Sequence, residues 1–104
     1  MNDEQREKAN TILQHYGATN QRHQLIEECA ELIQAISKIY RRGCGPDIPP
    51  DAYENLVEEC ADVLIIIEQM LEMYEIPDHE LQRMVDYKCK RQEERMNESL
   101  GRNP

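Results

Sequence analysis

The chain contains neither tryptophan nor phenylalanine, and none of its apolar runs approaches the roughly 20 residues that a membrane-spanning helix needs. The N-terminus also lacks the succession of basic, apolar and small residues that forms a signal peptide. These two absences predict a protein that does not enter the membrane and that resides in the cytoplasm.

Cysteine pairs of the CxxC type are missing as well, although the chain has 4 cysteines. Without such pairs the spacing disfavours both a zinc site and a disulfide framework. Cys29 and Cys60 occupy matching places inside helical patterns and are expected to be small buried hydrophobic residues.

Positive charge is scarce, with 12 Lys and Arg residues against 21 Asp and Glu residues and a net charge of −9. This balance argues against a partner that is a nucleic acid polymer, because Lys and Arg supply most of the affinity for phosphate backbones. It does not exclude a small polyphosphate that is bound through a bridging cation.

The alternating pattern of a β-strand is absent, and apolar residues recur instead at helical spacing. The sequence predicts one domain over residues 1–104, with helices at about 3–16, 20–42, 51–75 and 78–98. Gly17 is expected to end the first helix, and residues 43–50 are expected to form a loop. The expected N-terminal caps of the later helices are Thr19 or Asn20, Asp51 and Asp78.

These helices predict an all-α fold, an antiparallel four-helix bundle with short connections. The third helix is apolar over much of its circumference and should be central. Since a short chain with such a helix needs further cover, we expect a homodimer or a homotetramer. The apolar residues of the second helix, expected to face the core, are Leu25, Ile26, Cys29, Ile33, Ile36 and Tyr40.

One motif occurs twice, once in residues 25–36 and again in residues 56–67. Each copy carries an acidic pair at spacing i, i+3, which on a helix places both side chains on one side. Side chains from two packed helices can converge on one point. The four carboxylates are Glu28, Glu31, Glu59 and Asp62. All-oxygen ligation favours Mg²⁺, Mn²⁺ or Ca²⁺, and no histidine follows a glutamate at the Glu-x-x-His spacing of di-iron bundles.

Glutamates that flank an apolar stripe are more often a solvated helix face. On that interpretation the chain is a non-catalytic helical interaction module. The repetition of the acidic pair in one reading frame, at matching angles to the core, favours a metal site instead.

The pattern Glu27-Glu28-x-x-Glu31 followed by Glu59-x-x-Asp62, with the apolar run of residues 63–67, resembles the MazG-like all-α nucleoside triphosphate pyrophosphohydrolase superfamily. The resemblance covers residues 23 to 95. It implies that Glu28, Glu31, Glu59 and Asp62 bind Mg²⁺, with Mn²⁺ as a substitute. It also implies hydrolysis of the α–β bond of an NTP or dNTP. Glu27 points away from the cluster and is a candidate for a supporting or water-activating role.

A basic stripe on the fourth helix consists of Lys88, Arg91 and Arg95. Alone it would be a solvated face, but the resemblance extends to a Lys-x-x-Arg element on this helix and implies contact with the substrate phosphates. The base contacts are open: His15, Tyr16, His23 and Tyr40 are available.

The related phosphoribosyl-ATP pyrophosphohydrolases typically continue their second acidic helix with an aromatic-His pair. This chain instead has Leu64-Ile65-Ile66-Ile67 at that place. Housekeeping of the nucleotide pool is therefore the first expectation, and the biosynthetic activity is the alternative.

Overall fold

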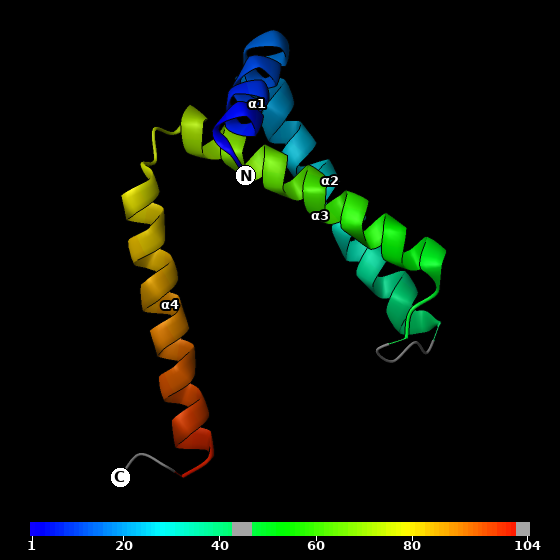
Figure 1. The fold of residues 1–104 in the computed structure, drawn as a ribbon, viewed down its shortest axis with the longest axis vertical. Helices are drawn as coiled ribbons and strands as arrows, with labels where there is room; N and C mark the ends of the chain where they lie inside the picture. The colour runs from blue at the N-terminus through cyan, green and yellow to red at the C-terminus, as the bar shows by residue number, and fades with distance from the viewer. Residues whose placement is uncertain (43–46, 102–104) are drawn as a thin grey trace. The chain divides into compact units, whose positions relative to one another are not determined.

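The computed structural model describes residues 1–42 and 47–101. Four helices make up almost all of this part, and none of it forms a strand. In chain order they are α1 (Asp3–Tyr16), α2 (Ala18–Arg41), α3 (Pro50–Met73) and α4 (Asp78–Ser99) (Figure 1). The predicted all-α class with four helices is therefore confirmed. The chain divides into two compact units, Met1–Tyr74 and Glu75–Pro104. The single domain over 1–104 stays a prediction.

The first helix begins with a capping box. The side-chain oxygen of Asn2 accepts from the backbone N–H of Gln5 (2.8 Å), and Gln5 Oε1 accepts from the backbone N–H of Asn2 (2.9 Å). Gly17, with φ of 88°, ends α1 by donating its N–H to the carbonyl of Leu13 (2.8 Å). Glycine adopts this positive φ without the steric cost that a side chain adds. The predicted stop at Gly17 is confirmed.

The predicted caps of the later helices are wrong. Helix α2 begins at Ala18, immediately after Gly17, so Thr19 and Asn20 lie inside its first turn. Helix α3 begins at Pro50, which suits a first helical position because proline lacks the N–H that would be unpaired there. Asp51 and Asp78 lie within the first turns of α3 and α4, whose N-cap positions are occupied by Pro49 and Pro77. Of the expected loop at 43–50, residues 43–46 lie outside the described residues.

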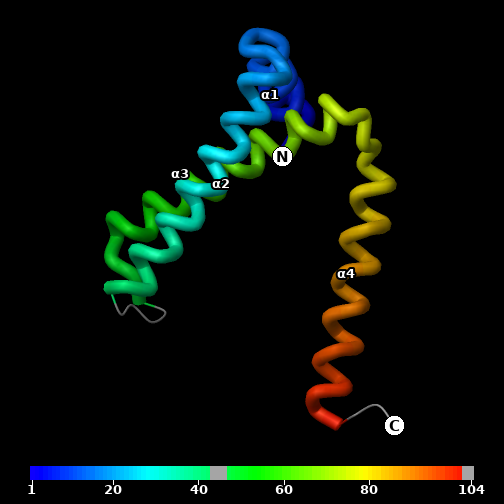
Figure 2. The backbone as a smooth tube through the Cα atoms, turned by 180° about the vertical axis from the view of Figure 1, so that it is seen from behind, coloured from blue at the N-terminus to red at the C-terminus, as the bar shows by residue number. Residues whose placement is uncertain are grey.

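Helices α2 and α3 form an antiparallel hairpin and lie side by side in both views (Figures 1 and 2). At the open end of the hairpin, Gln21 Nε2 donates to Gln69 Oε1 (2.7 Å). At the loop end, an ion pair of 3.2 Å joins Arg42 Nη1 to Asp51 Oδ2. These two contacts lie toward opposite ends of the hairpin, on either side of the repeated motifs.

Helix α1 packs against the hairpin through a buried polar network. Gln69 is 1% exposed; it accepts from Gln21 on α2 and donates its Nε2–H to the backbone carbonyl of Ala9 on α1 (3.1 Å). One amide thus joins all three helices, and because its partners satisfy it the burial costs little. The buried apolar residues around this unit are Ala9, Leu13, Ala35, Ala52 and Ile66.

Much of the apolar surface of the hairpin is exposed. On α2, Ile33 is 65% exposed and Tyr40 is 85% exposed, and Ile26 and Ile36 are also more than half exposed. The expectation that these four side chains are buried is therefore wrong for the single chain, because helical spacing defines an apolar face without showing what covers it. Cys29 is half-buried, whereas Cys60 is exposed against expectation.

The second unit contains α4. Between the units α3 ends at Met73, and Glu75 adopts a left-handed backbone conformation with φ of 53°. Pro77 then precedes the first residue of α4, in agreement with the predicted break. Within the described ranges, no helix combines the length and the apolar character needed to cross a membrane.

Candidate metal centre

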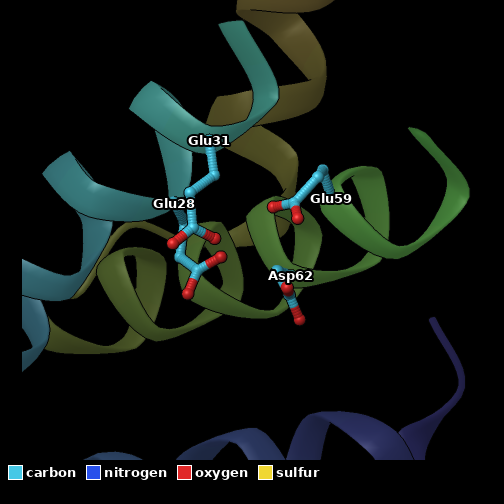
Figure 3. Close-up of side chains that lie close together, drawn as sticks. All are labelled: Glu28, Glu31, Glu59 and Asp62. Atoms are coloured by element: carbon cyan, nitrogen blue, oxygen red, sulfur yellow. The ribbon is translucent and has the colours of Figure 1, made fainter. Parts of the chain in front are cut away.

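Four carboxylates meet at the middle of the hairpin (Figure 3). Helix α2 supplies Glu28 and Glu31, and helix α3 supplies Glu59 and Asp62. One oxygen from each residue lies within 4.8 Å of the chosen oxygens of the other three. The i, i+3 spacing places each pair on one side of its helix, and the antiparallel register brings the two pairs together.

The cluster lies at the edge of the packed surface between the helices. Glu28 and Glu59 are half-buried, whereas Glu31 and Asp62 are exposed. A group bound among these oxygens would therefore be held from the protein side and reached from the solvent side.

Two oxygens of the cluster are buried and have no hydrogen-bond partner among the described residues. They are Glu28 Oε2 and Glu59 Oε2. The other oxygen of Glu28 accepts a hydrogen bond of 2.6 Å from Gln24 Nε2, one helical turn earlier on α2. Leaving a buried polar atom without a hydrogen-bond partner costs free energy, so these two oxygens are expected to have a partner when the protein functions.

Repulsion among the four carboxylates also favours a bound cation. Negative charges that lie within 4.8 Å of one another repel, and the four carboxylates form several such pairs. Burial raises the pKa of Glu28 above its ordinary value, and the charges of Asp62 and Glu31 raise it further, while the Gln24 hydrogen bond lowers it. Burial, followed by the charge of Glu31, raises the pKa of Glu59.

The donor set fits a hard divalent cation. All four groups present oxygen, which hard cations such as Mg²⁺, Mn²⁺ and Ca²⁺ prefer over the nitrogen and sulfur ligands of softer metals. A cation would give Glu28 Oε2 and Glu59 Oε2 their missing partner and would offset the repulsion. The cluster could therefore hold a metal ion.

Other residues predicted for the site lie elsewhere. Glu27 is exposed on α2 and is not among the four clustered residues. Lys88, Arg91 and Arg95 belong to α4 in the second unit, where their spacing places them along one side of that helix. The roles of these four residues stay predictions.

Sequence reasoning missed Gln24. The available signal is its position four residues before Glu28, which on a helix brings the two side chains together. Of the residues available for base contacts, His15 and Tyr16 instead contact each other edge to face, with ring centroids 4.7 Å apart.

Comparison with protein-family models gives a match over most of the chain. Residues 17–98 match the family model of the MazG nucleotide pyrophosphohydrolase domain, a range that contains all four clustered carboxylates. The comparison with curated proteins and the comparison with solved structures gave no match.

Proposed function

The chain belongs to the MazG nucleotide pyrophosphohydrolase family, and from that premise we propose that it hydrolyses the α–β bond of a nucleoside or deoxynucleoside triphosphate. The products are a nucleoside monophosphate and pyrophosphate. The observation that carries the proposal is the four-carboxylate cluster, in which Glu28 Oε2 and Glu59 Oε2 are buried without a partner. Housekeeping of the cytoplasmic nucleotide pool is the role that we infer.

Glu28, Glu31, Glu59 and Asp62 are the proposed ligands of Mg²⁺, for which Mn²⁺ could substitute. Held by these four carboxylates, the ion would supply positive charge that offsets the charge on the departing pyrophosphate and makes the attacking water more acidic. In the reaction the water oxygen bonds to the α-phosphorus while the bond from that phosphorus to the bridging oxygen breaks. The water loses a proton to solvent, and Glu27, which is exposed on α2 outside the cluster, is the proposed aid to this transfer.

Positive charge for the substrate phosphates would come from Lys88, Arg91 and Arg95. Guanidinium and ammonium groups form charge-assisted hydrogen bonds to phosphate oxygens, and three of them on one side of a helix can contact successive phosphates. This assignment rests on the helical spacing within α4.

A second copy of the chain is the proposed cover for the exposed apolar side chains of the hairpin. Ile33, Ile36 and Tyr40 on α2, and Tyr53 and Val57 on α3, are each at least half exposed. Soluble monomers rarely leave large apolar patches exposed, and such patches often mark contacts with another protein chain. This exposure supports a homodimer or a homotetramer.

The test of the reaction is an incubation with Mg²⁺ and a panel of ribonucleoside and deoxynucleoside triphosphates, followed by detection of pyrophosphate. Glu28→Gln and Asp62→Asn should each lower kcat/KM by at least about 100-fold, equivalent to about 2.7 kcal/mol, because each removes a negative ligand. Glu58→Gln is the matched control, since Glu58 is exposed and outside the cluster.

Orthophosphate as the only direct product would contradict α–β cleavage. Unchanged activity in both Glu28→Gln and Asp62→Asn would contradict the proposal that the four carboxylates form the active site. If the wild-type chain hydrolyses no nucleotide and Mg²⁺ does not raise its melting temperature, the interaction module is the better interpretation.

A further inference from the structure

A pocket of about 410 Å³ lies between α1 and α3. Its volume falls within the range of about 300–1,000 Å³ that is usual for small-molecule sites. The residues that matter for its chemistry are Gln5, Lys8 and Ile12 on α1 and Ala61, Leu64 and Ile65 on α3.

The pocket adjoins the acidic cluster through α3. Ala61 and Asp62 are consecutive, so their side chains leave the helix about 1.5 Å apart along its axis and about 100° apart around it. Ile65 follows Ala61 by one turn on the same side. In Figure 3 the Asp62 side chain extends from α3 on the side where the blue α1 ribbon passes. Because Ile65 also lies three residues after Asp62, the pocket and the cluster are neighbours on α3.

The pocket wall is apolar, and its polar groups are hydrogen-bond donors. The capping box of α1 uses Gln5 Oε1, and the capping bond does not involve the side-chain NH₂ of that residue. Lys8 forms an exposed ion pair with Glu4 (3.2 Å), in which both side chains are more than 70% exposed. Such exposed pairs contribute little free energy, so the ammonium group can turn to a ligand at little cost. The lining suits a flat apolar ring with acceptor atoms at its edge.

We propose that this pocket receives the base of the nucleotide whose phosphates reach the acidic cluster, and that Gln5 and Lys8 favour bases with a keto oxygen at the edge. The inference rests on the proposed function and adds a specificity determinant to it. Residues 3–16 of α1 lie outside the range 17–98 that matches the family model, so Gln5, Lys8 and Ile12 come from a segment that the family model does not cover.

The first test compares Ala61→Leu with Ala30→Leu. The repeat makes Ala30 the counterpart of Ala61, since each lies one residue before the second acid of a pair, but only Ala61 lines the pocket. Ala61→Leu should raise KM for the preferred nucleotide about tenfold or more by filling the pocket, and Ala30→Leu should change it less than about twofold. Inhibition by inorganic pyrophosphate, which has no base, should be the same in both variants. Equal KM values in the two variants would overturn the inference. A loss of pyrophosphate inhibition in Ala61→Leu as large as its rise in KM would also overturn it.

The second test uses Gln5→Glu, which keeps an oxygen for the capping bond with Asn2 and so preserves the fold of α1. It replaces the donor NH₂ by an acceptor. The ratio of kcat/KM for a keto base over its amino analogue should fall about tenfold or more, and exposed Gln14→Glu on the same helix should leave the ratio unchanged. An unchanged ratio in Gln5→Glu contradicts the proposal that this pocket selects the base. The absence of pyrophosphate release by the wild-type chain is a different result and contradicts the proposed function itself.

Discussion

At the scale of single residues, Gln24 gives the two oxygens of Glu28 different roles. Its amide donates to Oε1 at 2.6 Å, while Oε2 stays buried without a partner. A carboxylate held through one oxygen presents the other in a defined direction, which is how residues behind a metal ligand tune its affinity. Gln24 is therefore a positioning residue for the proposed cation.

The prediction at this scale concerns Gln24→Leu. Without the amide, the pKa of Glu28 loses the contribution that lowers it, so protons compete better with the cation. The Mg²⁺ concentration for half-maximal activity should rise by up to about tenfold, with the larger effect toward acidic pH. Titrations of activity with Mg²⁺ at two pH values would measure this. Gln34→Leu, an exposed change on the same helix, is the control, and identical titrations in both variants would disprove the role.

Spacing predicted which four carboxylates would meet, because i, i+3 pairs on two neighbouring helices leave few other arrangements. The residues that surround them were not predictable in the same way. Gln24 is one of several glutamines near the motif, and the side chain of Ala61 has no polar or reactive group that would mark it as part of a site. The pocket depends on where α1 crosses α3, which helical periodicity does not determine.

At the scale of elements, periodicity located every helix end to within about two residues of the observed bounds. The errors concern caps. Gly17 serves as the end of α1 and the start of α2, so no further residues remain for a separate cap at Thr19 or Asn20. Pro49 and Pro77 occupy the N-cap positions of α3 and α4, which leaves Asp51 and Asp78 inside the first turns.

The prediction at the scale of elements concerns the hairpin of α2 and α3. Ile33→Glu places a charge on the exposed apolar residues of α2, and burying that charge at a subunit contact would be costly. The variant should have a lower molar mass than the wild-type chain in sedimentation equilibrium, with unchanged helical circular dichroism. Gln34→Glu introduces the same side chain one residue away and should keep the wild-type mass. A monomeric wild-type chain, or equal masses in the two variants, would contradict the proposed contact.

At the scale of the whole molecule, the first unit contains the hairpin, the acidic cluster and the pocket, and the second contains α4 with its basic stripe. Helical spacing shows that Lys88, Arg91 and Arg95 share one side of α4, but it does not show which element that side faces. Contact between this stripe and the substrate phosphates therefore stays a prediction.

The pH dependence of stability follows from the raised pKa values. The pKa of Glu59 in the folded chain is higher than its ordinary value of 4.5. Between these two values the folded chain binds more protons than the unfolded chain, so the contribution of Glu59 to the free energy of unfolding falls as the pH rises. A bound cation would offset this loss above the raised pKa, where the carboxylate is charged. Below 4.5 protons would displace the cation.

The most direct test is the melting temperature of the wild-type chain, Glu59→Gln and Glu58→Gln, measured with and without Mg²⁺ from pH 4 to pH 8. The wild-type chain and Glu58→Gln should both gain melting temperature with Mg²⁺, and the gain should grow as the pH rises. Without metal at pH 7, Glu59→Gln should melt above the wild-type chain, because it removes one repelling charge, and Mg²⁺ should raise its melting temperature little. An equal Mg²⁺ effect in Glu59→Gln and Glu58→Gln would contradict a cation site at the four carboxylates.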